Sequence, residues 1–171
     1  MAEQDGVFLY VGTYGDEATA RGDYRLVQEL HKAKAVGTYD ALVVTRDDEG
    51  KVHVDKDETA VRRGGWGGAV VGAFVGVVMP PALLGAAVAG GTVGAVGAHL
   101  RQHLSRKDVE ELGDLIGQGQ AALVVLGRSR LDDVLDRDQL SAQKHVYKQL
   151  GVKPKDIDQA VHAAVREVGP G

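Results

Sequence analysis

The sequence contains no cysteine, which excludes a disulfide framework, thiolate chemistry and a zinc site built on cysteine. Serine is almost as scarce, and none of the three serines, Ser105, Ser129 and Ser141, lies in a G-x-S-x-G nucleophile motif. No segment has the pattern of a catalytic centre, so we expect a protein that is not an enzyme and that holds no cofactor and no metal.

The charge balance also lacks a positive excess. The net formal charge is −4 and the isoelectric point is about 5.8, which gives no electrostatic case for a nucleic-acid partner. The first six residues carry acids and lack the basic-then-apolar pattern of a secretory signal. We therefore expect the chain to stay inside the cell.

Charge is missing altogether from one long stretch. Residues 66–98 hold no charged side chain, and 17 of these 33 residues are glycine or alanine. Small residues recur at every fourth position, namely at Gly64, Gly68, Gly72 and Gly76, and again at Ala86, Gly90, Gly94 and Ala98. Four residues are close to one helical turn, so each series follows one helix face on which another helix can approach closely. The pattern predicts a glycine-zipper helical hairpin over residues 64–100 that turns at Pro80 and Pro81 and supports a homo-oligomer.

Two environments suit such a hairpin. Its arms, 64–79 and 82–100, would be about 24 Å and about 28 Å long as helices, slightly short for a hydrocarbon core of ~30 Å. The basic residues that flank it are Arg62, Arg63, Arg101, Arg106 and Lys107. Basic ends favour a hairpin that enters the cell membrane from the cytoplasmic side. We therefore predict a membrane-associated protein that oligomerises through residues 64–100; the alternative is a soluble cytoplasmic protein whose hairpins bundle inside a ring, shell or filament.

The rest of the chain alternates between strand and helix patterns. Residues 7–13, 40–46, 51–55 and 121–126 have the β-branched, apolar character of strands, and 40–46 is continuous enough to be buried on both faces. Asp16 and Glu17 open a helix that ends near Gly37, and Ser105 and Asp108 form a capping pattern for a helix over 106–117. The order strand, helix, strand, strand, helix, strand predicts an α+β fold of the ferredoxin-like, split βαβ type, with an antiparallel sheet and helices on one face.

These patterns predict three parts. Residues 7–55 and 105–127 form the ferredoxin-like domain, residues 64–100 form the inserted hairpin, and residues 128–171 form a charged helical tail. Within the tail we expect one helix capped by Ser129 and Asp132, a second over 139–150 and a third that starts at Pro154. If the hairpin is a separable insertion, a short Gly/Ser linker in its place should leave the domain folded.

Four segments carry a resemblance to a known family. They are YDALVV, RDDEGKV, GGWGGAVVGAFVGVVMPPALLGAAVAGGTVGAVGA and LGDLIGQGQAALVVL, in that order along the chain. Together they resemble DUF1269, a bacterial family of unknown function whose members are described as predicted membrane proteins. The resemblance covers roughly residues 7 to 127. It implies a ferredoxin-like domain split by a glycine-zipper hairpin and implies no catalytic residues.

Two other patterns allow weaker interpretations. Residues 12–16 lie between a strand and a helix, where a phosphate could bind, but they lack a nucleotide-binding glycine motif and include Asp16. His99 and His103 are four residues apart, a spacing that can place two imidazoles on one metal, but no third ligand is evident. An ordinary turn and a polar helix end explain both patterns. A small-molecule sensor or enzyme that uses an open sheet face is the remaining alternative.

Overall fold

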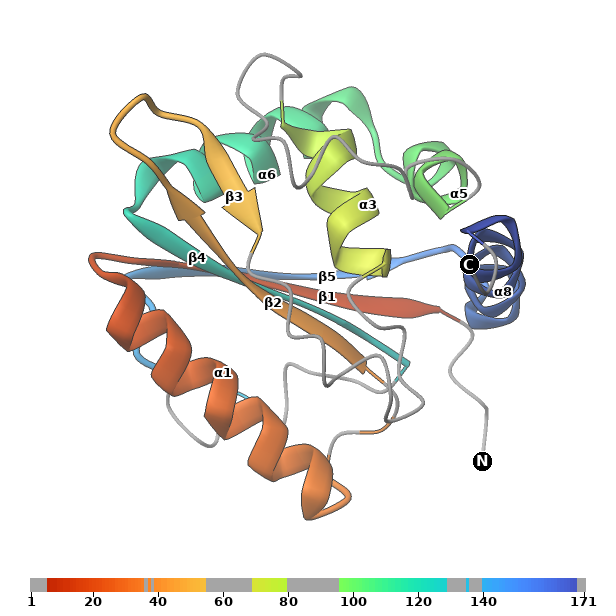
Figure 1. The fold of residues 1–171 in the computed structure, drawn as a ribbon, viewed down its shortest axis with the longest axis horizontal. Coiled ribbons are helices and arrows are strands. Elements are labelled where there is room, and N and C mark those ends of the chain that lie inside the picture. The colour runs from red at the N-terminus through yellow and green to blue at the C-terminus, as the bar shows by residue number, and fades with distance from the viewer. Residues whose placement is uncertain are drawn as a thin grey trace.

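The computed structural model of the protein describes residues 6–35, 37, 39–54, 69–79, 96–128, 135 and 140–168. Figure 1 shows a central antiparallel sheet with helices on both sides. The strands are β1 (Val7–Tyr14), β2 (Tyr39–Arg46), β3 (Val52–Val54), β4 (Ala121–Gly127) and β5 (Lys144–Leu150). The helices are α1 (Glu17–Lys32), α3 (Ala69–Val78), α5 (Ala98–Gln102), α6 (Arg106–Gln118) and α8 (Pro154–Val168).

The sheet has the order β3-β2-β4-β1-β5 and contains a split βαβ unit. β4 pairs antiparallel with both β1 and β2, so β1 and β2 run in the same direction on either side of it and α1 connects them. The register places Leu126 opposite both Leu9 and Asp40. This arrangement confirms the predicted α+β class with an antiparallel sheet and is consistent with a ferredoxin-like fold.

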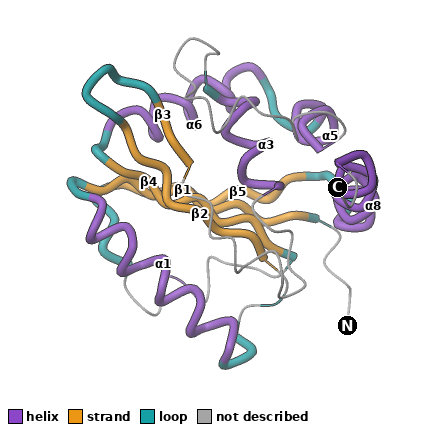
Figure 2. The backbone as a smooth tube through the Cα atoms, viewed as in Figure 1, coloured by secondary structure: helices purple, strands orange, loops and turns teal. Residues whose placement is uncertain are grey.

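The two faces of the sheet are covered by different helices (Figure 2). Alternate residues of β1 point to opposite sides: Leu9 and Val11 join one core, and Phe8 and Tyr10 join the other. α1 packs over the second core, while α3, α5, α6 and α8 cover the first. The prediction of helices on one face is therefore wrong. Because β1, β2 and β4 are apolar on both sides, each face needs a cover that excludes water.

α3 belongs to the domain core. Its residues from Val70 to Val78 are buried except for Gly72 and Gly76, and Phe74 is fully buried in the same cluster as the sheet. At its start the Val71 amide donates to the buried carboxylate of Asp40, with 2.9 Å between nitrogen and oxygen. The prediction of a separable insertion is therefore wrong for α3, because this helix supplies the apolar layer over β2 and β4. The predicted turn at Pro80 and Pro81 lies outside the described residues.

The C-terminal segment also completes the domain. Residues 144–150 form β5 and pair with β1 along its whole length, so the predicted helix over 139–150 is wrong. The edge of β1 offers a row of backbone donors and acceptors, and satisfying them outweighs the weak local preference of this sequence. The helix that begins at Pro154 is confirmed. The predicted cap at Ser129 and Asp132 lies outside the described residues.

Candidate functional site

A cavity of about 700 Å³ lies between α3 and α6 at the end of β2. Its apolar lining comes from Val77, Val78, Met79 and Val109. Its polar lining comes from Arg46, Glu110, Asp114 and Gln118. An apolar wall with a few converging polar groups is the usual composition of a small-molecule site. Two carboxylates, those of Glu110 and Asp114, are among the described lining residues.

Two glycines of α6 shape this cavity. A Cβ atom at Gly113 would lie 2.6 Å from the carbonyl oxygen of Val78, so only glycine allows the two helices to approach this closely. One turn later, the carbonyl oxygen of Gly117 accepts a hydrogen bond from the guanidinium group of Arg46. The close contact between α3 and α6 therefore depends on Gly113, a residue outside the predicted zipper.

A buried polar network ties α1 to β1 on the face of the sheet that α1 covers. The Tyr14 hydroxyl donates to Asp23 Oδ2 at 2.7 Å, and the same carboxylate oxygen accepts the Ser141 amide at 2.7 Å. Tyr10 and Tyr14 share a further hydrogen bond of 3.1 Å between their hydroxyl oxygens. Burial, the charge of a neighbouring Tyr10 and the hydrogen bond to Asp23 raise the pKa of Tyr14 above its ordinary value, so its hydroxyl stays protonated. This network joins three segments of the chain and leaves Asp23 with two donors.

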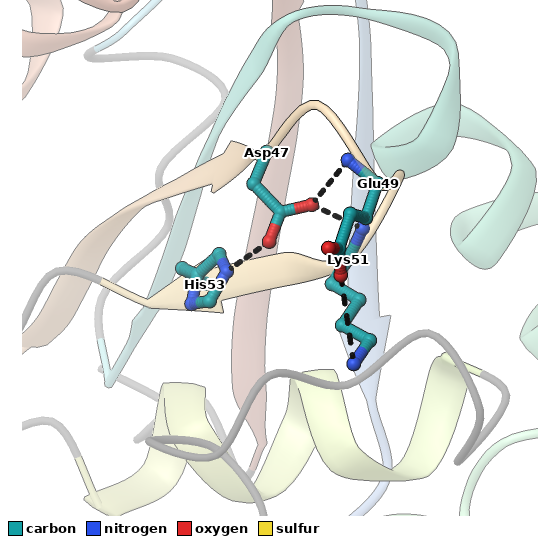
Figure 3. Close-up of polar contacts among 4 residues, drawn as sticks. All are labelled: Asp47, Glu49, Lys51 and His53. Atoms are coloured by element: carbon teal, nitrogen blue, oxygen red, sulfur yellow. Dashed lines mark hydrogen bonds and ion pairs between the residues drawn. The ribbon is translucent and has the colours of Figure 1, made fainter.

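A second carboxylate organises the turn between β2 and β3 (Figure 3). Asp47 Oδ1 accepts the backbone amides of Glu49 and Lys51, both at 2.9 Å, and Oδ2 lies 2.7 Å from His53 Nε2. The hydrogen bond to His53, followed by those to the two amides, holds the pKa of Asp47 below its usual range. Both carboxylate oxygens are thus engaged within the hairpin, and the geometry is that of a turn stabilised by its own side chains.

The predicted packing residues have different surroundings. Gly72 and Gly76 are half-buried, whereas the other residues from Val70 to Val78 are buried, and a Cβ at Gly72 would meet no described atom within 4 Å. Ala98 is exposed at the start of α5. Gly64, Gly68, Ala86, Gly90 and Gly94 lie outside the described residues. The two described glycines of the series therefore share one face, Ala98 lies on another helix, and the other members of the series have no described position.

The basic residues predicted to flank the hairpin are exposed where they are described. Arg101 in α5 and Arg106 and Lys107 in the first turn of α6 all face solvent. Arg62 and Arg63 lie outside the described residues. The capping box that the sequence predicts at Ser105 is present, with reciprocal bonds of 3.0 and 3.1 Å to Asp108. This capping box fixes the start of α6 at Arg106, so Arg106 and Lys107 lie in its first turn.

Three residues at these sites were not predicted from the sequence. Asp23, Asp40 and Gly113 are polar or small residues inside apolar patterns: Asp23 shares the buried face of α1 with Ala20 and Val27, and Asp40 opens a buried strand. A buried acid usually has a hydrogen-bond partner, and a glycine inside a helix often marks close packing. These two rules could have singled out Asp23, Asp40 and Gly113 from the sequence. Neither rule says which residue each of them contacts.

The histidine pair does not extend into a larger ligand set. His103 is exposed and His99 is half-buried, and no group of three His, Asp or Glu residues that could hold a metal occurs in the described parts of the chain. Within the same residues, no helix has both the length and the apolar character needed to cross a bilayer.

Comparison with protein families gives one match. The family described as "Protein of unknown function (DUF1269)" matches residues 65–160, which is more than half of the chain. The match reaches through β5 into α8 and leaves out β1, α1, β2 and β3, whereas the expected resemblance ran from about residue 7 to 127. No curated protein and no solved structure matches the sequence. The α3–α6 contact, β5 and all of the described cavity lining except Arg46 thus fall within the matched region, and the chain belongs to the DUF1269 family, whose function is unknown.

Proposed function

We propose that this protein is a non-enzymatic assembly protein whose copies associate through the glycine face of α3, defined by Gly72 and Gly76, together with the rest of the small-residue segment 64–100. The observation that carries the proposal is the burial pattern of α3. Seven of its residues are packed into the core, while the two glycines are only half-buried and no described atom lies within 4 Å of a Cβ at Gly72. A glycine face lets a second helix approach until the backbones touch.

We further propose that the assembly is associated with the cytoplasmic side of the cell membrane. The support is the uncharged stretch 66–98 and the exposed Arg101, Arg106 and Lys107 that follow it. Because the apolar faces of α3 already contact the sheet and α6, this helix can serve a membrane only through its glycine face or by leaving the core. For the first arm, residues 64–79, this constraint favours the alternative, in which the arm packs inside a soluble assembly.

The substitution Gly72→Leu tests the assembly. The Cβ atom of a leucine there would meet no described atom within 4 Å, so the domain should keep its fold, but the side chain would separate two helices packed on this face. Gly22→Leu is the matched control, because Gly22 is an exposed glycine of α1 and a Cβ atom added there would have no neighbour within 4 Å. Particle size by light scattering, with and without detergent, is the measurement.

The expected result is a smaller particle for Gly72→Leu and an unchanged particle for Gly22→Leu. A monomeric parent protein, or a Gly72→Leu particle of the parental size, would show that the glycine face of α3 is not the seam. If the parent needs detergent to stay dispersed, membrane association is supported; a single particle size in both conditions supports the soluble assembly.

The cavity between α3 and α6 favours a second function, the binding of a small, mainly apolar molecule. Its volume of about 700 Å³ lies within the range of ligand sites. Val109→Trp would fill the space from the wall of α6 without removing a charge, and Val161→Trp on α8 is a comparison outside the cavity lining. Native mass spectrometry of the purified protein should show a bound mass that Val109→Trp removes and Val161→Trp retains. The absence of any bound mass in the parent protein would count against this function.

A further inference from the structure

Two short segments of the chain carry basic residues and no acids. Residues 99–107, HLRQHLSRK, contain Arg101, Arg106 and Lys107, and residues 151–155, GVKPK, contain Lys153 and Lys155. Together they hold five formal positive charges in a protein whose net charge is −4, so the remaining residues sum to −9. The sequence alone separates these segments by more than forty residues.

The fold brings the two segments together. A Cβ at Gly151 would lie 3.2 Å from His103 Nδ1, so the end of α5 touches the loop between β5 and α8. Beneath the surface, Leu104 and Val152 are buried in the same hydrophobic cluster. Figure 1 shows α5 beside α8 at this end of the molecule. The basic corner therefore consists of Arg101, His103, Arg106, Lys107, Lys153 and Lys155.

The charges of the basic corner face solvent. Arg101, Lys107, Lys153 and Lys155 are exposed, and the Arg106 side chain is 95 % exposed. In the described part of the chain the one ion pair of these residues joins Arg106 to Glu110, at 3.8 Å on the solvent side. The nearby Asp108 is instead held by Lys148 Nζ at 2.7 Å. The acids of α6 thus neutralise little of this positive surface.

We propose that the basic corner binds the anionic headgroups of a membrane surface. Clusters of exposed Lys and Arg are attracted to anionic lipid, each cation contributing roughly fivefold to the affinity. The corner has no Phe, Tyr or Trp on which nucleic-acid bases could stack, and it follows directly on the uncharged stretch 66–98. A lipid surface offers partners for the cations and for the part of this stretch outside α3, whereas a nucleic acid offers partners for the cations alone. This inference rests on the membrane part of the proposed function and not on the glycine face of α3.

The test is co-sedimentation of the full chain with vesicles of phosphatidylcholine alone and of phosphatidylcholine mixed with phosphatidylserine. We expect binding only to the mixed vesicles, with a loss on raising the salt from about 0.1 M to about 1 M, because ions screen exposed charges. The double variant Lys107→Gln and Lys155→Gln removes one charge from each segment. Both residues lie in the first turn of a helix, where a cation opposes the helix dipole, so their loss leaves the fold intact.

The matched control removes two exposed cations elsewhere, with Lys32→Gln on α1 and Lys51→Gln beside the β2–β3 turn. We expect about a 25-fold loss of affinity for the corner variant and little change for the control. Equal losses for both variants, equal binding to uncharged vesicles, no binding at all, or displacement from the vesicles by RNA would each overturn the assignment to anionic lipid. Particle size measured on the same samples keeps this result separate from assembly: a change there concerns the glycine face, while vesicle binding concerns the corner.

Discussion

The clearest prediction compares one substitution, Gly→Ala, at two glycines on neighbouring helices. Gly72 of α3 and Gly113 of α6 both lie inside helices, where alanine is favoured over glycine by about 0.8–1 kcal/mol. The local gain should therefore be similar at the two positions. What differs is the space around the new methyl group.

At Gly72 the methyl group meets no described atom within 4 Å, so the gain should appear in full. At Gly113 it would lie 2.6 Å from the carbonyl oxygen of Val78, a backbone atom that cannot move without shifting α3 against α6. Overpacking of this kind costs about 1–3 kcal/mol. After the local gain is subtracted, Gly113→Ala should lose about 1 kcal/mol of unfolding free energy, while Gly72→Ala gains about the same amount.

Urea unfolding of the full chain, followed by circular dichroism, measures both free energies, and for a protein of this size 1 kcal/mol corresponds to about 2–4 °C in Tm. Gly22→Ala on α1 adds a third arm, because Gly22 also has open space beside it and should behave like Gly72. A stabilised Gly113→Ala would refute the close contact between α3 and α6. A destabilised Gly72→Ala would show that something already occupies the glycine face of α3.

Two further predictions concern buried and paired carboxylates. Asp40→Ala should lower the unfolding free energy by about 2 kcal/mol, because the buried Val71 amide loses its acceptor; Asp16→Ala, at the exposed cap of α1, should cost less in the same urea experiment. Lys148→Met should destabilise the protein at neutral pH, and this difference should shrink as the pH falls from 3.8 towards 2. The hydrogen bond from Lys148, followed by those of Ser105, lowers the pKa of Asp108 to about 2, so this carboxylate stabilises the fold above its ordinary pKa and stops doing so once it is protonated. Urea midpoints for both proteins across this range are the measurement, and a difference that is constant with pH would contradict the pairing.

The burial of α3 reverses the outcome expected for a linker in place of residues 64–100. Because Phe74 and its neighbours in α3 are buried against the sheet, the Gly/Ser linker should expose β2 and β4 and unfold the domain. The uniform apolar composition of the segment suggested an independent unit. An apolar composition indicates that a segment must be shielded from water. It does not indicate whether lipid, another copy of the protein or the sheet of the same chain shields it.

The sequence by itself determined much of the local structure of this protein, although not that of β5. The apolar runs at 7–13 and 121–126 predicted strands, the continuous run at 40–46 predicted a strand buried on both faces, and Ser105 with Asp108 predicted the start of α6, because periodicity and capping act over a few residues. The tertiary structure decided which segments meet. β5 forms because β1 has an open edge, Gly113 matters because Val78 lies opposite, and the basic corner exists because α5 ends against Gly151. Each of these three features depends on contacts between residues far apart in the chain. A local sequence pattern does not specify which distant residue a segment will contact.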